Sequence, residues 1–108
     1  MERYVFYADV KTSLADKAVA ALLPQPFKTV ENKSGFEPWN NGFEMGYIFT
    51  QNDQAIPIDL QTSMESIFPA SSFTATLNSS HTPFLSMPKI LGDVIQQAAQ
   101  VAVTKKAA

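Results

Sequence analysis

The fold is decided by residues 45–88, which read MGYIFTQNDQAIPIDLQTSMESIFPASSFTATLNSSHTPFLSMP. The continuous apolar run Tyr47-Ile48-Phe49 predicts a strand that is covered on both faces. Residues 57–68 then have helical spacing, and residues 73–77 alternate between apolar side chains and threonine, as a strand near a sheet edge does. A strand–helix–strand unit of about 30 residues is typical of a right-handed parallel crossover.

Two helices are expected around these strands. Pro57 suits the first turn of the helix between them, and Asp59 suits its positive end. Its buried stripe should consist of Leu60, Met64, Ile67 and Phe68, with Pro69 ending the helix. Ser86 is expected to cap the last helix, with Pro88 in its first turn. That helix should bury Met87, Ile90, Leu91, Val94, Ile95 and Ala98.

The first 44 residues carry weaker signals. Residues 4–7 are apolar and aromatic, which predicts a strand or an extended segment packed on the rest of the chain. Thr12 or Ser13 should cap a helix that ends at the prolines of residues 24–26 and buries one face, formed by Leu14, Ala18, Ala21 and Leu22. Residues 27–43 have no clear period and many turn formers. Phe36 and Trp39 in this loop either anchor it to the core or line a pocket wall.

Composition excludes several classes of function. The 108 residues have a net charge of -2 and scattered basic side chains, so we expect no nucleic-acid partner. The chain has no cysteine, which excludes thiolate chemistry. It has one histidine, so we do not expect a metal site built from histidines. We also expect no cofactor. The chain has neither the apolar run of ~18–20 residues that crosses a membrane nor a signal peptide, so a cytoplasmic protein is expected.

Asp53 and His81 are the candidate catalytic pair. Each follows a predicted strand by about the same distance, and the carboxyl ends of parallel strands meet at the edge where ligands bind. Since neighbouring strands lie about 4.8 Å apart, the two loops should touch. A carboxylate that accepts a hydrogen bond from one imidazole nitrogen fixes the tautomer and stabilises the imidazolium. The alternative is a turn aspartate and a structural histidine without catalytic roles.

The segments QNDQAIP at residues 51–57 and NSSHTPFLSMP at residues 78–88 resemble the C-terminal third of α/β-hydrolase-fold proteins. They are closest to the small esterase and hydroxynitrile-lyase-like branch, whose acid stands in a D-x-x-x-P loop and whose histidine stands in an S-H-x-P-x-L-S-x-P loop. The separation of 28 residues between Asp53 and His81 also suits that branch. The resemblance covers residues 45–97 well and residues 4–39 more weakly.

This resemblance implies an α/β fold: the C-terminal part of an α/β-hydrolase-like parallel sheet with flanking helices and a partial cap. Residues 1–44 would be a cap-like helix and loop, and residues 45–108 a strand–helix–strand–helix part of the core. The implied parent reaction is hydrolysis of a small-molecule ester or related acyl bond, with Asp53 orienting His81 and His81 as general base. A lyase variant in the same branch uses the same pair.

The nucleophile of that family is not found in the chain. No G-x-S-x-G motif or oxyanion-hole loop is present, and the chain order Ser…Asp…His places the serine before Met1. Neither Ser80 nor Ser86 is expected to be the attacking hydroxyl. Three interpretations stay open: a truncated hydrolase-like protein, a non-catalytic chain that binds a partner chain or small molecule, and a chain that complements a separate N-terminal polypeptide.

The resemblance also implies a missing neighbour in the sheet. In the family, the strand that carries the acid is flanked by a further strand, which this sequence does not contain. Residues 46–50 should therefore present an unpaired edge with apolar faces, which is a template for pairing with another chain. We expect self-association, a complementary chain or marginal stability.

Overall fold

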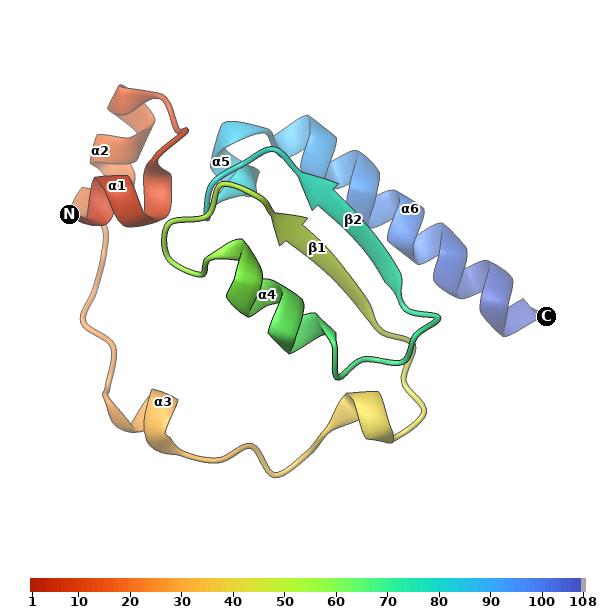
Figure 1. Ribbon diagram of the computed structural model, residues 1–108. Coiled ribbons are helices and arrows are strands. Elements are labelled where there is room, and N and C mark those ends of the chain that lie inside the picture. The colour runs from red at the N-terminus through yellow and green to blue at the C-terminus, as the bar shows by residue number, and fades with distance from the viewer. Residues whose placement is uncertain (108) are drawn as a thin grey trace.

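The computed structural model describes residues 1–107 and has the expected α/β class, with two parallel strands and helices around them (Figure 1). The elements run in the order α1 (Glu2–Tyr7), α2 (Thr12–Ala20), α3 (Lys28–Glu31), η1 (Pro38–Asn40), β1 (Gly46–Thr50), α4 (Ile58–Glu65), β2 (Phe73–Leu77), α5 (Pro83–Ser86) and α6 (Pro88–Ala107).

β1 and β2 pair in parallel, in a register that runs from Gly46 opposite Phe73 to Thr50 opposite Leu77. The backbone pairing continues past both strands, because the N–H of Asn52 donates to the carbonyl of Ser79 at 2.9 Å. Consequently the loop after β1 and the loop after β2 leave the sheet side by side. Helices α1 and α2 lie beyond this same carboxyl edge (Figure 1).

The predicted strands at residues 46–50 and 73–77 are present, with one difference in burial. β2 alternates as expected, with Phe73, Ala75 and Leu77 less exposed than the two threonines between them. The apolar run in β1 predicted a strand covered on both faces, but its side chains are only half-buried. The physical reason is incomplete cover by helices: α4 packs on β1, whereas α6 packs on β2, so the faces of β1 are only partly covered.

Helices α4 and α6 pack on the two strands, and their predicted stripes are only partly correct. α4 lies beside β1 and α6 beside β2, on either side of the pair (Figure 1). On α4 the buried side chain is Gln61, whereas three of the four predicted core residues are exposed: Leu60 (51%), Met64 (43%) and Ile67 (54%). On α6 the predicted stripe splits, since Met87, Leu91, Val94 and Ala98 are half-buried but Ile90 and Ile95 are exposed.

Two cap predictions are wrong. Ser86 is the last residue of α5 and is separated from α6 by Met87, so it does not occupy the cap position. α2 begins after Lys11 without a side-chain cap bond from Thr12 or Ser13. Both helices are fixed by their packing against other elements rather than by a local cap.

The aromatic run of residues 4–7 is helical, which corrects the prediction of a strand or extended segment. It forms α1, which packs on α2 through a small cluster of Tyr7, Val10 and Ala15, with Leu85 of α5 against it. The buried face of α2 is centred on Ala15, whereas Leu14 and Leu22 of the predicted face are exposed. A small residue at the contact lets the two helices approach closely, and this packing overrides the strand preference of valine and aromatic residues.

Between α2 and β1 the chain is extended along the outside. Every residue from 20 to 37 is exposed, and the segment arcs away from the strands in Figure 1. Trp39 packs on Phe68, with ring centroids 6.1 Å apart, which fits the anchoring alternative for that residue. Phe36, 52% exposed, packs edge-to-face on Phe43 instead of on a core.

The hydrophobic core is small. The buried hydrophobic residues within the described part of the chain are Tyr7, Val10, Ala15 and Leu77. The radius of gyration is 15.9 Å, compared with about 13 Å for a compact domain of this length. Within residues 1–107, large apolar side chains on α4 and α6, such as Leu60 and Ile95, are exposed, so the arrangement resembles one side of a larger sheet rather than a closed domain.

Candidate active site at the carboxyl edge of the strands

Asp53 and His81 meet at the carboxyl edge of the sheet. Nδ1 of His81 lies 2.9 Å from Oδ2 and 3.1 Å from Oδ1 of Asp53. This is the distance expected from the paired strand-end loops. The Asp53 side chain is 4% exposed and the His81 side chain 31%, so the pair has a buried acid and a ring that reaches the surface.

The loop after β1 is built around the Asp53 carboxylate. Oδ1 accepts from the N–H groups of Ala55 (2.8 Å) and Ile56 (2.9 Å), and Oδ2 accepts from the hydroxyl of Thr50 (2.8 Å). Burial by itself would raise the pKa of Asp53, but the hydrogen bonds from Ile56, His81, Thr50 and Ala55 outweigh it and hold that pKa below its usual value. The carboxylate is therefore ionised at neutral pH.

An ionised carboxylate accepts hydrogen bonds only, which settles the roles in the pair. Nδ1 of His81 must be the donor, so the neutral ring carries its proton on Nδ1 and has a lone pair on Nε2. In this tautomer Nε2 can take a proton from a neighbouring hydroxyl, and Asp53 stabilises the cation that results.

Gln61 supports the acid, and the sequence reasoning missed it. Its side chain is 1% exposed, and Oε1 accepts from the N–H of Thr50 at 2.9 Å. Nε2 donates to the carbonyl oxygens of Thr50 (2.9 Å) and Ile56 (2.7 Å). One amide thus ties the end of β1 to the loop that carries Asp53. A glutamine within an amphipathic helix gave no sequence signal, because glutamine is ordinarily a solvent-facing residue there.

The loop before His81 is held by the N-terminal helices, a second contact missed at the sequence level. Asp9, between α1 and α2, accepts from the N–H of Ser80 at 2.9 Å and from its hydroxyl at 2.5 Å. The hydroxyl of Thr82 donates to the carbonyl of Phe6 at 2.9 Å. These partners are more than seventy residues apart in the sequence, and no local pattern connects them.

No serine in the described residues completes a triad. The hydroxyl of Ser80 is 1% exposed and bonds to Asp9, and that of Ser79 donates to the carbonyl of Ser80. Within residues 1–107, His81 has hydrogen-bond partners in Asp53 alone. The ring of Phe6 packs on the His81 ring, with centroids 5.4 Å apart.

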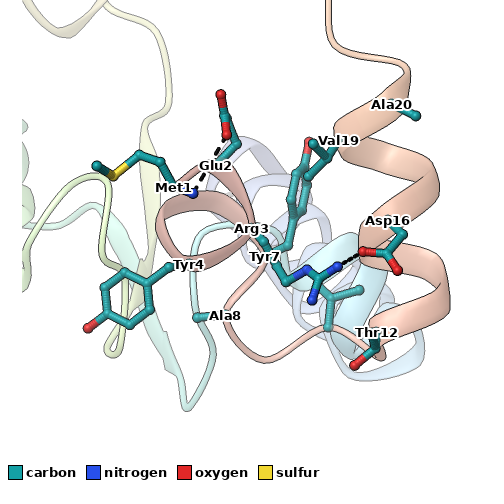
Figure 2. Close-up of a pocket in the computed structure, with 11 residues that line it drawn as sticks. Met1, Glu2, Arg3, Tyr4, Tyr7, Ala8, Thr12, Asp16, Val19 and Ala20 are labelled. Carbon is teal, nitrogen blue, oxygen red and sulfur yellow. Dashed lines mark ion pairs between the residues drawn. The ribbon is translucent and has the colours of Figure 1, made fainter.

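An open hollow lies elsewhere. It has a volume of about 710 Å³ and is formed by α1, α2 and their connection, with the Arg3–Asp16 ion pair at its wall (Figure 2). Neither Asp53 nor His81 lines it. Hydrogen-bond geometry and chemistry therefore place the candidate site at the strand ends rather than in this open hollow.

No group of three His, Cys, Asp or Glu side chains in residues 1–107 is arranged to hold a metal ion. None of the helices in that range combines the length and the apolar character needed to cross a membrane.

The comparisons relate the chain to the α/β hydrolases. No protein-family model matches the chain. A curated relative, the putative methylesterase 13, chloroplastic, of Arabidopsis thaliana, is 30% identical over 89 residues, covering 82% of this chain and 20% of the relative.

Solved structures agree with this relative. A pyrethroid hydrolase crystallised with BIF superposes with a TM-score of 0.69 at 25% identity, over 91% of this chain and 38% of that chain. A variant of the same hydrolase gives a TM-score of 0.64 at 25% identity, over 92% and 39%. The resemblance to a C-terminal portion of the α/β-hydrolase family is thus confirmed, and the chain spans about a fifth of its curated relative.

Proposed function

We propose that this chain supplies the acid and the histidine of an ester-hydrolysing active site. Asp53 orients the ring, and His81 acts as general base through Nε2. The observation that supports this most directly is the 2.9 Å hydrogen bond between a buried, multiply hydrogen-bonded carboxylate and Nδ1 of the single histidine. The names of the relatives, a methylesterase and a hydrolase, support a small-molecule ester as the substrate class.

The proposed reaction needs a serine hydroxyl from outside these 108 residues. That oxygen adds to the ester carbonyl while its proton passes to Nε2 of His81. The same proton then goes to the departing alkoxide, leaving an acyl-serine that water hydrolyses by the reverse sequence of proton transfers. Residues 1–44 would contribute the end of a cap over the ester. Alone, the chain has no activated hydroxyl with which to form the acyl intermediate.

A chimera tests the proposal. This chain replaces the matching C-terminal part of the pyrethroid hydrolase, and turnover of an aryl ester is measured for the chimera, its His81→Ala variant and the free chain. We expect turnover by the chimera, its loss in His81→Ala, and no burst from the free chain. Asp59→Asn, an exposed acid in the first turn of α4, is the matched control and should keep activity. A folded chimera whose activity survives His81→Ala would contradict the proposal.

A specific observation favours a second role, binding of a partner chain along β1. Thr50 directs its N–H and carbonyl away from β2, since Gln61 binds both. Because backbone groups alternate along a parallel strand, Gly46 and Ile48 direct theirs the same way. The Gln61 amide covers the edge at Thr50, and a further strand would pair at Gly46 and Ile48. The exposed apolar side chains of Leu60 and Met64 on the neighbouring helix, and of Ile67 just after it, would be covered by the same partner.

Sedimentation separates these two roles. If apolar surface drives association, the free chain will form oligomers over the micromolar range. The double variant Leu60→Ser with Ile67→Ser will shift the equilibrium to monomer, whereas Val30→Ser, which removes an even more exposed apolar side chain from the outer segment, will not. A monodisperse wild-type monomer with a cooperative melt would contradict this second role and leave the acid–histidine proposal intact.

A further inference from the structure

The contacts on either side of His81 come from the same part of the chain. Ser80 precedes the histidine and donates twice to Asp9, through its N–H and its hydroxyl. Thr82 follows the histidine and donates to the carbonyl of Phe6. The α1 helix and its connection to α2 therefore hold the two residues that flank His81 in the sequence, Ser80 and Thr82.

Burial makes these contacts strong constraints. Ser80 is 1% exposed and Thr82 is 5% exposed, so both donating residues are buried, while the acceptor Asp9 lies at the surface. An unsatisfied buried polar group is costly, which gives each contact more leverage than a surface hydrogen bond. The Phe6 ring lies against the imidazole and adds a packing contact from the same helix.

The negative charge of Asp9 strengthens its hydrogen bonds with Ser80. Burial would raise the pKa of Asp9, but hydrogen bonds led by those from the Ser80 hydroxyl and backbone bring it below its usual value. Asp9 is thus an ionised acceptor at neutral pH, and hydrogen bonds to a charged acceptor are shorter and stronger than neutral ones.

Resting on the proposed function, we infer that Asp9 is a positioning residue for His81, acting through Ser80. It fixes the backbone before the histidine so that Nδ1 faces Asp53 and Nε2 stays free for the proton. Asp53 accepts the hydrogen bond from Nδ1, whereas Asp9 fixes the backbone position from which the His81 side chain extends. The N-terminal helices then serve the chemistry directly, in addition to any role as a cap.

The test measures the tautomer of the His81 ring directly. Nitrogen-15 shifts distinguish a ring protonated on Nδ1 from one protonated on Nε2, and the single histidine gives one unambiguous set of signals. At mildly alkaline pH, where an imidazole is neutral, the wild-type chain should be almost wholly in the Nδ1–H form. Asp9→Ala should raise the Nε2–H fraction about tenfold, as loss of a charged hydrogen bond implies. Asp16→Ala, which breaks the Arg3 ion pair in the same helix pair, should leave the ring unchanged.

Each outcome decides the inference. If Asp9→Ala lowers the melting temperature but leaves the tautomer of the folded chain unchanged, the role of Asp9 is merely structural and the inference is overturned. If Asp9→Ala does not fold, Ser80→Ala decides, because it removes one of the two bonds and should give a smaller shift in the same direction; no shift overturns the inference. An inactive chimera with an Asp9-dependent tautomer would instead remove the proposed hydrolase function and leave the positioning role standing.

Discussion

The strand-end loops and the outer segment of residues 20–37 differ in what they bury. The loops hold four of the buried polar residues of the described chain, namely Asp53, Ser79, Ser80 and Thr82, and the fifth, Gln61 of α4, bonds to the loop after β1. The outer segment exposes every residue, including Phe27 (74%) and Val30 (70%). The buried polar groups of the loops find hydrogen-bond partners both within the loops and in α1, α4 and the connection between α1 and α2, whereas burial of the apolar side chains of the outer segment needs further layers of structure.

Removing the charge at the centre of the loops should have the largest effect. In the chimera, Asp53→Asn keeps the shape of the side chain but no longer requires the Nδ1–H tautomer of His81. We expect turnover of an aryl ester to fall about 10⁴-fold, as happens when a triad acid is neutralised. A loss smaller than tenfold in a folded chimera would mean that the pair has no role in the reaction.

The next effect concerns the internal support of these loops. Gln61→Leu leaves the N–H and carbonyl of Thr50 and the carbonyl of Ile56 without their amide partner. We expect a loss of about 2–4 kcal/mol in the free energy of unfolding, measured by urea denaturation. Gln97→Leu, at an exposed position on α6, should change it by less than about 0.5 kcal/mol. Equal effects of the two substitutions would show that the hydrogen bonds of the Gln61 amide do not contribute to the free energy of unfolding.

Acid should weaken the loops selectively. The pKa of Asp53 is lower in the folded chain than its ordinary value. Its contribution to stability is therefore fully present above the unfolded-state pKa of about 3.9 and is lost as the pH falls through the lower folded value. Urea titrations across that range should show falling stability in the wild type and a shallower pH dependence in Asp53→Asn. An unchanged pH dependence in the variant would assign the acid sensitivity to other carboxyl groups.

The outer segment should respond least. Phe27→Ala and Val30→Ala remove large apolar groups that touch little, so each should change the free energy of unfolding by less than about 0.5 kcal/mol. A loss above 2 kcal/mol in either would show that the segment packs on a surface in solution, and the contrast between the two regions would disappear.

Local sequence determined the elements around the site. The period-two pattern in residues 73–77, the apolar run in residues 47–49 and the helix start at Pro57 each depend on neighbours within a few residues, and all three appear in the structure. Because parallel strands end at one edge, these elements place the loops of Asp53 and His81 side by side. The motif resemblance then gave the family, which the comparisons confirm.

Tertiary structure decided the remainder. Residues 4–7 have strand-forming side chains but are helical because they pack on α2 and His81. Which face of a helix is buried also depends on what lies against it. Ala15 is therefore buried where Leu14 was predicted to be, and Gln61 is buried where Leu60 was predicted to be. The bonds of Asp9 to Ser80 and of Phe6 to Thr82 join residues separated by 71 and 76 positions. Such contacts have no local signature, since only the folded chain brings their partners within reach.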